Sequence, residues 1–164
     1  MLSQKKISKK DDLYNGVTLP APQANYIWSL AWLSFCSGVY AMRRGYYDLS
    51  LVPLGVWLTS MNYWRRPDFS WRRYLDIMYV HSSLAYQLTR AVKAQNARSY
   101  FICISIAIFF FPIGIYYKQK PSTSAFFHGM VHIFGNIANV ILYSGEVPTP
   151  KWLCNILIKK DCFI

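Results

Sequence analysis

Two histidines near the end of the chain have the spacing of a metal-binding pair. His128 and His132 are four residues apart, so both imidazoles lie on one face of a helix. Two neutral imidazoles in this arrangement can share a zinc ion, but a zinc site needs further ligands from elsewhere. The alternative is a pair of hydrogen-bonded core histidines beside a packing groove of small residues, formed by Gly129, Gly135 and Ala138. A two-residue motif has low specificity, which favours the second interpretation.

Asp76 is the one acidic residue in residues 74–92, a mainly apolar stretch that also contains several other polar residues. On a helix it forms one polar stripe with Ser83, Gln87 and Arg90, and we expect this stripe to face the interior of a bundle. An ionisable group inside a membrane span is costly and is therefore a candidate functional residue. Arg72 lies four residues before Asp76, at contact spacing on a helix, so the sequence predicts a structural Asp76–Arg72 pair in preference to a proton relay.

The order of the polar residues resembles a family pattern. Ser60-x-x-x-Trp64, then Asp76, then His128-x-x-x-His132 is similar to the pattern of the alkaline ceramidase and adiponectin/progestin receptor superfamily of membrane hydrolases. That family carries Ser-x-x-x-His on one helix, an Asp on the next and His-x-x-x-His on the last, and three histidines hold zinc. The resemblance implies that Ser60 and Asp76 match the family's catalytic serine and aspartate, and that His128 and His132 match its paired zinc ligands.

The resemblance departs from the family at two points. Trp64 stands where the family has its first zinc histidine, and an indole cannot bind a metal. His81 is no obvious substitute, because it lies about 140° around a regular helix from Asp76 and would reach the same site only if the helix were irregular. The chain also offers five spans where the family has seven. With a third ligand, zinc would activate a water for amide or ester hydrolysis, Asp76 would orient it and Ser60 would stabilise the oxyanion.

The composition favours a membrane protein. Of the 164 residues, 54% are hydrophobic and 15% are charged, against about 45–50% and about 25% in soluble domains. The aromatic share of 18% excludes a disordered chain. The four cysteines are single, so neither a zinc ribbon nor a C-x-x-C redox motif is present.

Five stretches are apolar enough to be considered as membrane spans of about 17–25 residues. They are residues 26–42, 49–64, 74–92, 99–117 and 124–143. We therefore expect an all-α, polytopic transmembrane bundle of four to five spans, with Pro53 in a first helical turn. A polar N-terminal tail (1–25) and a C-terminal tail (144–164) flank it, and residues 152–158 of the second tail are a possible short amphipathic helix.

The net charge of +11 is placed mainly between the spans. Basic side chains at membrane edges contact anionic lipid headgroups. We expect this role, and no binding of nucleic acid, for six arginines: Arg43, Arg44, Arg65, Arg66, Arg72 and Arg73.

Three functions are open at this point. The first is a non-catalytic accessory subunit of a larger membrane complex, such as a respiratory complex or ATP synthase in the mitochondrial inner membrane. Its expected partners are other membrane subunits and anionic phospholipid, and no cofactor is expected. The alternative is a zinc-dependent lipid amidase of the ceramidase type. A proton or solute pathway is the third, and it requires the polar stripe of residues 74–92 to face His128 and His132 across a cavity.

Overall fold

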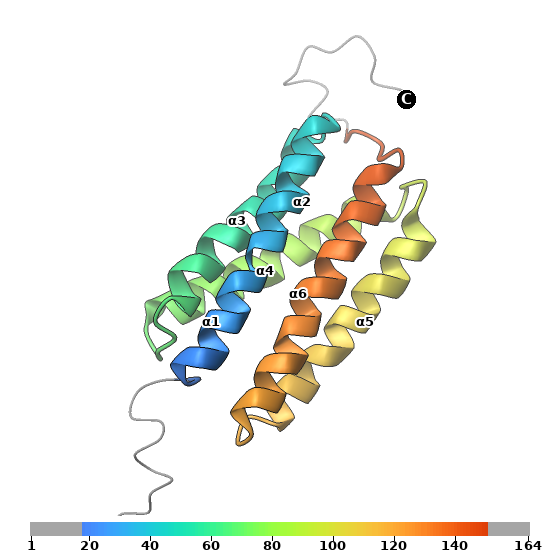
Figure 1. The fold of residues 1–164 in the computed structure, drawn as a ribbon. Helices are drawn as coiled ribbons and strands as arrows, with labels where there is room; N and C mark the ends of the chain where they lie inside the picture. The colour runs from blue at the N-terminus through green and yellow to red at the C-terminus, as the bar shows by residue number, and fades with distance from the viewer. Residues whose placement is uncertain (1–17, 151–164) are drawn as a thin grey trace, which may run out of the picture.

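The computed structural model describes residues 18–150 and is helical throughout its regular elements (Figure 1). The helices are α1 (Ala21–Leu30), α2 (Trp32–Arg43), α3 (Tyr47–Trp64), α4 (Trp71–Ala91), α5 (Ala97–Tyr116) and α6 (Pro121–Ser144). The predicted all-α class is confirmed for this part of the chain.

The first predicted span consists of two helices in line. α1 and α2 are separated only by Ala31, whose N–H still bonds the Ile27 carbonyl (3.0 Å) and whose carbonyl accepts from Ser34 (3.0 Å). Together they cover residues 21–43, a rod of about 34 Å at 1.5 Å per residue. The helix begins at Ala21, inside the range expected as a tail (1–25).

Two helices are long and apolar enough to cross a membrane. α5 has a mean hydropathy of 2.0 and α6 of 1.4 over their most apolar windows. They correspond to the predicted spans 99–117 and 124–143. Among the helices of residues 18–150, only these two are long and apolar enough to be candidate membrane spans. This supports an integral membrane protein without confirming four to five spans.

The turn before α3 places Pro53 differently from the prediction. Gly45 has a φ of +80°, which favours glycine, and the N–H groups of Gly45 and Tyr46 bond the carbonyls of Met42 and Ala41. This is a Schellman ending of α2. α3 therefore begins at Tyr47, and Pro53 lies inside the helix. The expectation of a first-turn proline was wrong because the helix starts earlier.

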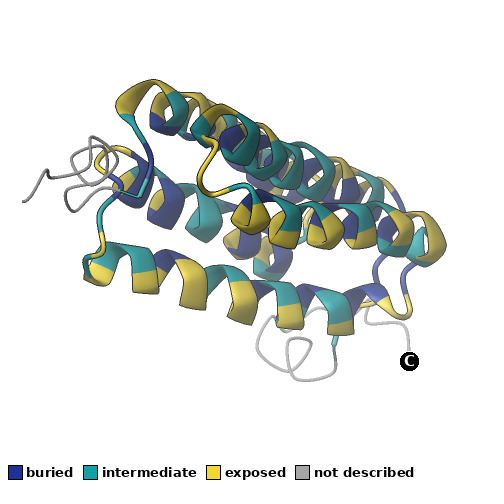
Figure 2. Ribbon diagram, turned by 90° about the horizontal axis from the view of Figure 1, so that it is seen from below, coloured by how far each residue is buried: buried dark blue, intermediate teal, exposed yellow. Residues whose placement is uncertain are grey.

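The helices form two hairpins and a crossing helix. α2 packs against α3, α5 against α6, and the α1–α2 rod also contacts α6. α4 packs along α3, while α5 packs on α6, so α4 and α5 stand apart (Figure 1). Figure 2 shows buried residues on the facing sides of the helices and exposed residues on the outer sides.

A short segment after α6 crosses one end of the bundle. The Tyr46 hydroxyl donates to the Gly145 carbonyl (2.7 Å), Arg90 Nη2 donates to the Pro148 carbonyl (3.0 Å), and the Gln95 N–H donates to the Glu146 carbonyl (2.9 Å). These bonds hold residues 145–150 across the ends of α2, α4 and α6. The predicted amphipathic helix at 152–158 lies outside the described residues.

Arg72, in the first turn of α4, pairs with a different aspartate from the one predicted. Its Nη2 donates to Asp68 Oδ2 (2.6 Å) and to the Arg66 carbonyl (3.2 Å). The predicted Asp76–Arg72 pair is therefore wrong. Asp68 precedes Arg72 by the same four residues and lies beside it in the turn, whereas the side chain of Asp76 is buried against α3.

A buried ion pair joins the first turn of α3 to the last turn of α4. Arg90 Nη1 contacts Asp48 Oδ2, and the Tyr86 hydroxyl also donates to this oxygen (2.6 Å). The two charged side chains are only 7% and 10% exposed. Breaking a buried pair costs much more than replacing both members, because one charge is otherwise left without a partner.

We expect Arg90→Met to lower the free energy of unfolding by about 3 kcal/mol, because the Asp48 carboxylate stays buried and unpaired. The double variant Asp48→Leu/Arg90→Met is expected to recover most of this loss. Denaturant unfolding in detergent measures both. Lys93→Met, at an exposed cation outside the pair, is the control, and a single variant no less stable than this control would contradict the role of the pair.

The turn between α3 and α4 gives a pH-dependent prediction. Hydrogen bonds from the hydroxyl and N–H of Ser70, and the Arg72 guanidinium, lower the pKa of Asp68. A carboxylate with a lowered pKa contributes stability that is fully present above its unfolded pKa, about 4, and is lost as the pH falls through the lowered value. Asp68→Asn should thus lower the thermal midpoint at neutral pH and match the wild type in acid. Ser70→Ala should reduce that difference, and a difference independent of pH would contradict this explanation.

Candidate functional site

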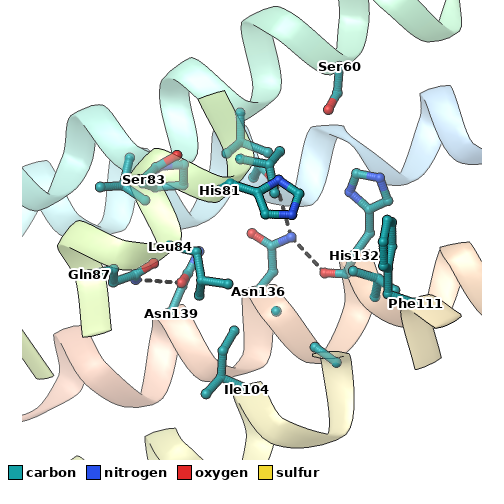
Figure 3. A pocket seen from close by; sticks show the side chains of 18 of the residues that line it. Ser60, His81, Ser83, Leu84, Gln87, Ile104, Phe111, His132, Asn136 and Asn139 are labelled. Carbon is teal, nitrogen blue, oxygen red and sulfur yellow. Dashed lines mark hydrogen bonds between the residues drawn. The ribbon is translucent and has the colours of Figure 1, made fainter. Parts of the chain in front are cut away.

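A cavity of about 350 Å³ lies among α3, α4, α5 and α6 (Figure 3). Its volume falls in the range of about 300–1,000 Å³ that is usual for ligand pockets. Twelve of its 22 lining residues are apolar. The polar remainder includes the residues that the sequence singled out: Ser60, Asp76, His81, His128 and His132. The structure therefore brings residues from three helices, spread over more than 70 positions, to one site.

Asp76 and Ser60 are in direct contact on one wall of the cavity. Asp76 Oδ1 accepts hydrogen bonds from Ser60 Oγ (2.8 Å) and Thr59 Oγ1 (2.7 Å), and all three side chains are buried. The contact fits the roles that the family resemblance implies for these two residues. It also explains how a carboxylate is accommodated away from any cation, because two hydroxyl donors of α3 satisfy one of its oxygens.

The two histidines of α6 face the cavity without hydrogen-bond partners. Their ring centroids are 5.4 Å apart, as expected for one helix face. Neither imidazole is hydrogen-bonded to another residue of 18–150; the one bond at His132 goes from Asn136 Nδ2 to the backbone carbonyl (2.7 Å). The interpretation as hydrogen-bonded core histidines therefore finds no support in these residues. Four ring nitrogens remain available to an occupant of the cavity.

Trp64 lies beside His128, and zinc does not fit this set. The indole meets the imidazole edge-on with a centroid distance of 4.9 Å, and its Nε1 is buried without a hydrogen-bond partner in the described part of the chain. Trp64, at the position where the resemblance would require a zinc histidine, thus lies against His128, but an indole has no lone pair to give. Within residues 18–150, no group of three His, Cys, Asp or Glu side chains could hold a metal ion.

His81 lies at the exposed edge of the same cavity. Its Nδ1 is 2.7 Å from the Ile77 carbonyl, so this nitrogen is the donor and Nε2 is the uncommitted one. Asp76 and His81 both line the cavity although α4 is regular over Trp71–Ala91. The expectation that they reach one site only through an irregular helix was wrong, because the cavity extends around a broad arc of α4.

A network of amides and hydroxyls forms the polar floor. Ser37 Oγ donates to Asn136 Oδ1 (2.7 Å), Asn136 Nδ2 donates to Ser34 Oγ (3.2 Å), and Gln87 Nε2 donates to Asn139 Oδ1 (2.6 Å). These bonds tie α2 and α4 to α6. The sequence analysis did not single out Asn136, although its spacing of four residues from His132 places it on the same helix face.

The polar stripe of α4 faces inward, as predicted. Asp76, Ser83, Gln87 and Arg90 are all buried, and the first three line the cavity together with the α6 histidines. Between His132 and the ion pair of Arg90, however, the polar side chains are the amides of Asn136, Asn139 and Gln87 and the hydroxyls that bond them. Amides do not titrate, so the described side chains on this side of His132 form a polar floor to the cavity.

The six arginines lie at the two ends of the bundle. Arg44 caps the end of α6, with Nε donating to the Tyr143 carbonyl (3.0 Å) and Nη2 to the Ser144 carbonyl (3.2 Å). Arg43, Arg65 and Arg66 are exposed. Arg73 lies over the Phe69 ring at 5.4 Å. Their contact with lipid headgroups stays a prediction.

Comparisons with known proteins find no match among family models, curated proteins or solved structures. The resemblance to the ceramidase superfamily therefore rests on the sequence motif alone.

We expect Trp64→His to create a zinc site, because a third imidazole would stand beside His128 and His132 where the indole now lies. Metal analysis of the detergent-purified variant should find about one zinc per chain, and the wild type should retain none. Trp57→His is the matched control, since Trp57 is on the same helix but packs against Phe35 and Trp32. Equal zinc in both variants would contradict the assignment.

Proposed function

We propose that this chain is a non-catalytic, multi-pass subunit of a larger membrane assembly. The observation that carries the non-catalytic part is the packing of Trp64 on His128, 4.9 Å between ring centroids. Trp64 supplies no ligand beside His128 and His132, and His81, on another wall of the cavity, is not grouped closely enough with them to bind a shared metal ion among residues 18–150. Two histidines alone do not hold a catalytic zinc. On this proposal the cavity can hold a ligand but lacks the metal ion that hydrolysis would require.

The outer faces of the bundle support several spans. Large apolar side chains are strongly exposed on α3, α4 and α5, a surface that water-soluble monomers rarely show. They include Leu51 (65%) and Leu58 (63%) of α3, Met78 (68%) of α4, and Ile102 (55%) and Phe109 (65%) of α5. The low overall hydropathy of α4 fits this proposal, because its polar stripe is turned inward and its apolar face outward. Five spans, with α1 and α2 as one, is the arrangement we propose.

The ends of the bundle suit the edges of a membrane. Exposed Arg65 and Arg66 lie near Phe69 (61% exposed) and Trp71 (67%), the combination of cations and aromatic rings found at headgroup level. Anionic phospholipid and neighbouring subunits are the partners of this proposal. Its placement in an energy-transducing complex of the mitochondrial inner membrane rests on the basic, aromatic composition.

A zinc-dependent lipid amidase is the second candidate. The contact between Ser60 and Asp76, 2.8 Å beside two unpartnered imidazoles, favours it. The missing third ligand opposes it. The two proposals differ in one measurable property, which is the release of fatty acid by the purified chain.

After mild solubilisation of native membranes, we expect the chain to migrate far above the mass of 164 residues in native electrophoresis, and its removal to lower the amount of the same assembly. Chain purified by itself should release no fatty acid from ceramide, with or without added zinc. Hydrolysis by the wild type that is lost in Asp76→Asn would overturn the proposal in favour of the amidase, and a monomer under mild conditions would overturn the subunit role.

A further inference from the structure

The cavity opens sideways between α4 and α5, the two helices that stand apart. Ile77, Ile108 and Phe111 line it and are 36%, 48% and 39% exposed. The lining residues of α5 (Ala97–Tyr116) lie in the middle and second half of that helix. In the proposed orientation this opening faces the acyl chains, so an occupant has to enter from the bilayer and carry an apolar tail.

The charges of the lining restrict the polar head of such an occupant. Among residues 18–150, no Lys or Arg side chain lines the cavity, and Asp76 is the one acidic residue that does. A phosphate would lie beside a carboxylate without a compensating cation, which is unfavourable in an apolar surrounding. The head is therefore neutral, which excludes the anionic phospholipids expected at the arginines.

The hydrogen-bonding groups and the rings restrict the head further. Each neutral imidazole of His128 and His132 has one N–H to donate, and no described residue accepts it. Phe111 and Trp64 lie against His128, with centroid distances of 6.4 and 4.9 Å. Of these two rings, Phe111 lines the cavity, so a flat head that accepts hydrogen bonds matches its ring and the imidazole donors.

From these observations we infer that the cavity binds a neutral membrane quinone. Its ring lies beside Phe111, a carbonyl oxygen accepts an N–H from the α6 histidines, and its isoprenoid tail leaves between Ile77 and Ile108. The inference concerns binding and includes no electron transfer. It goes beyond the role as a subunit and does not depend on it.

A larger side chain at position 135 would fill the cavity without disturbing the packing of the helices. Gly135 lines the cavity from α6, and a Cβ built on it meets no atom within 4 Å. Gly129, on the same helix, is different, because there a Cβ would lie 2.6 Å from the Tyr26 hydroxyl of α1. A leucine at position 135 thus enters the binding space without a helix–helix clash, and replacing a helical glycine also favours the helix.

The experiment measures binding of a ubiquinone analogue with two isoprene units to the full chain in phosphatidylcholine nanodiscs, by quenching of tryptophan fluorescence. We expect saturable binding that Gly135→Leu weakens at least tenfold and that Gly135→Ala keeps. His132→Leu, which removes a donor, should also weaken binding tenfold or more. Thermal unfolding shows whether Gly135→Leu and His132→Leu are folded. If one of them is not, the binding measured with the other tests the inference.

Ceramide and diacylglycerol are the competing neutral lipids in the same assay. Failure of both to displace the quinone at equal concentration supports the inference. Displacement by either lipid, quenching that rises linearly without saturation, or equal binding by the wild type and folded Gly135→Leu would overturn it. None of these outcomes alters the result of native electrophoresis, so the inference and the subunit proposal succeed or fail separately.

Discussion

Hydrogen bonds between buried side chains are the interactions on which this bundle depends. Helices in a bilayer gain little hydrophobic driving force from one another, because lipid tails are as apolar as leucine. Their association has to come from close packing and from polar groups that find partners inside. Asn136 and Asn139 of α6 supply these partners for Ser37 of α2 and Gln87 of α4. The network therefore decides which helices surround α6 and where α4 can lie.

The same requirement shows why the cavity is unusual. Nearly every buried polar side chain near it is satisfied, including the Asp76 carboxylate through Thr59 and Ser60. The imidazoles of His128 and His132 line it without a hydrogen-bond partner in 18–150, and the buried Nε1 of Trp64 beside His128 also lacks one. A buried polar group without a partner costs stability, so an occupant that accepts these N–H groups would recover that cost on binding. This energetic argument favours a ligand over an empty packing defect.

Features that depend on helical periodicity could be predicted from the sequence. Contacts between residues that are distant along the chain could not. The inward stripe of α4 follows from the 100° step per residue, and the common helix face of His128 and His132 follows from their spacing. The Asp48–Arg90 pair joins positions 42 residues apart, and no local pattern indicates it. Arg72 had two aspartates at equal spacing, Asp68 and Asp76, and only the orientation of α4 against α3 decides between them. The contact of Ser60 with Asp76 was not predicted, because the resemblance only assigned each residue a position in the motif and no rule of spacing joins them.

The opening between α4 and α5 links the two proposals physically. Because α4 packs on α3, and α5 on α6, the six helices of residues 18–150 leave the cavity open between α4 and α5. Lipid tails are fluid and would cover the opening only transiently, whereas a helix of a neighbouring subunit would cover it and enclose whatever lies beside His132. Such a helix would have to be apolar toward Ile108 and Phe111 and would need no charge, since no cation lines the cavity. If that helix also contacted the ligand, assembly would raise ligand affinity, and by reciprocity the ligand would strengthen assembly by the same factor.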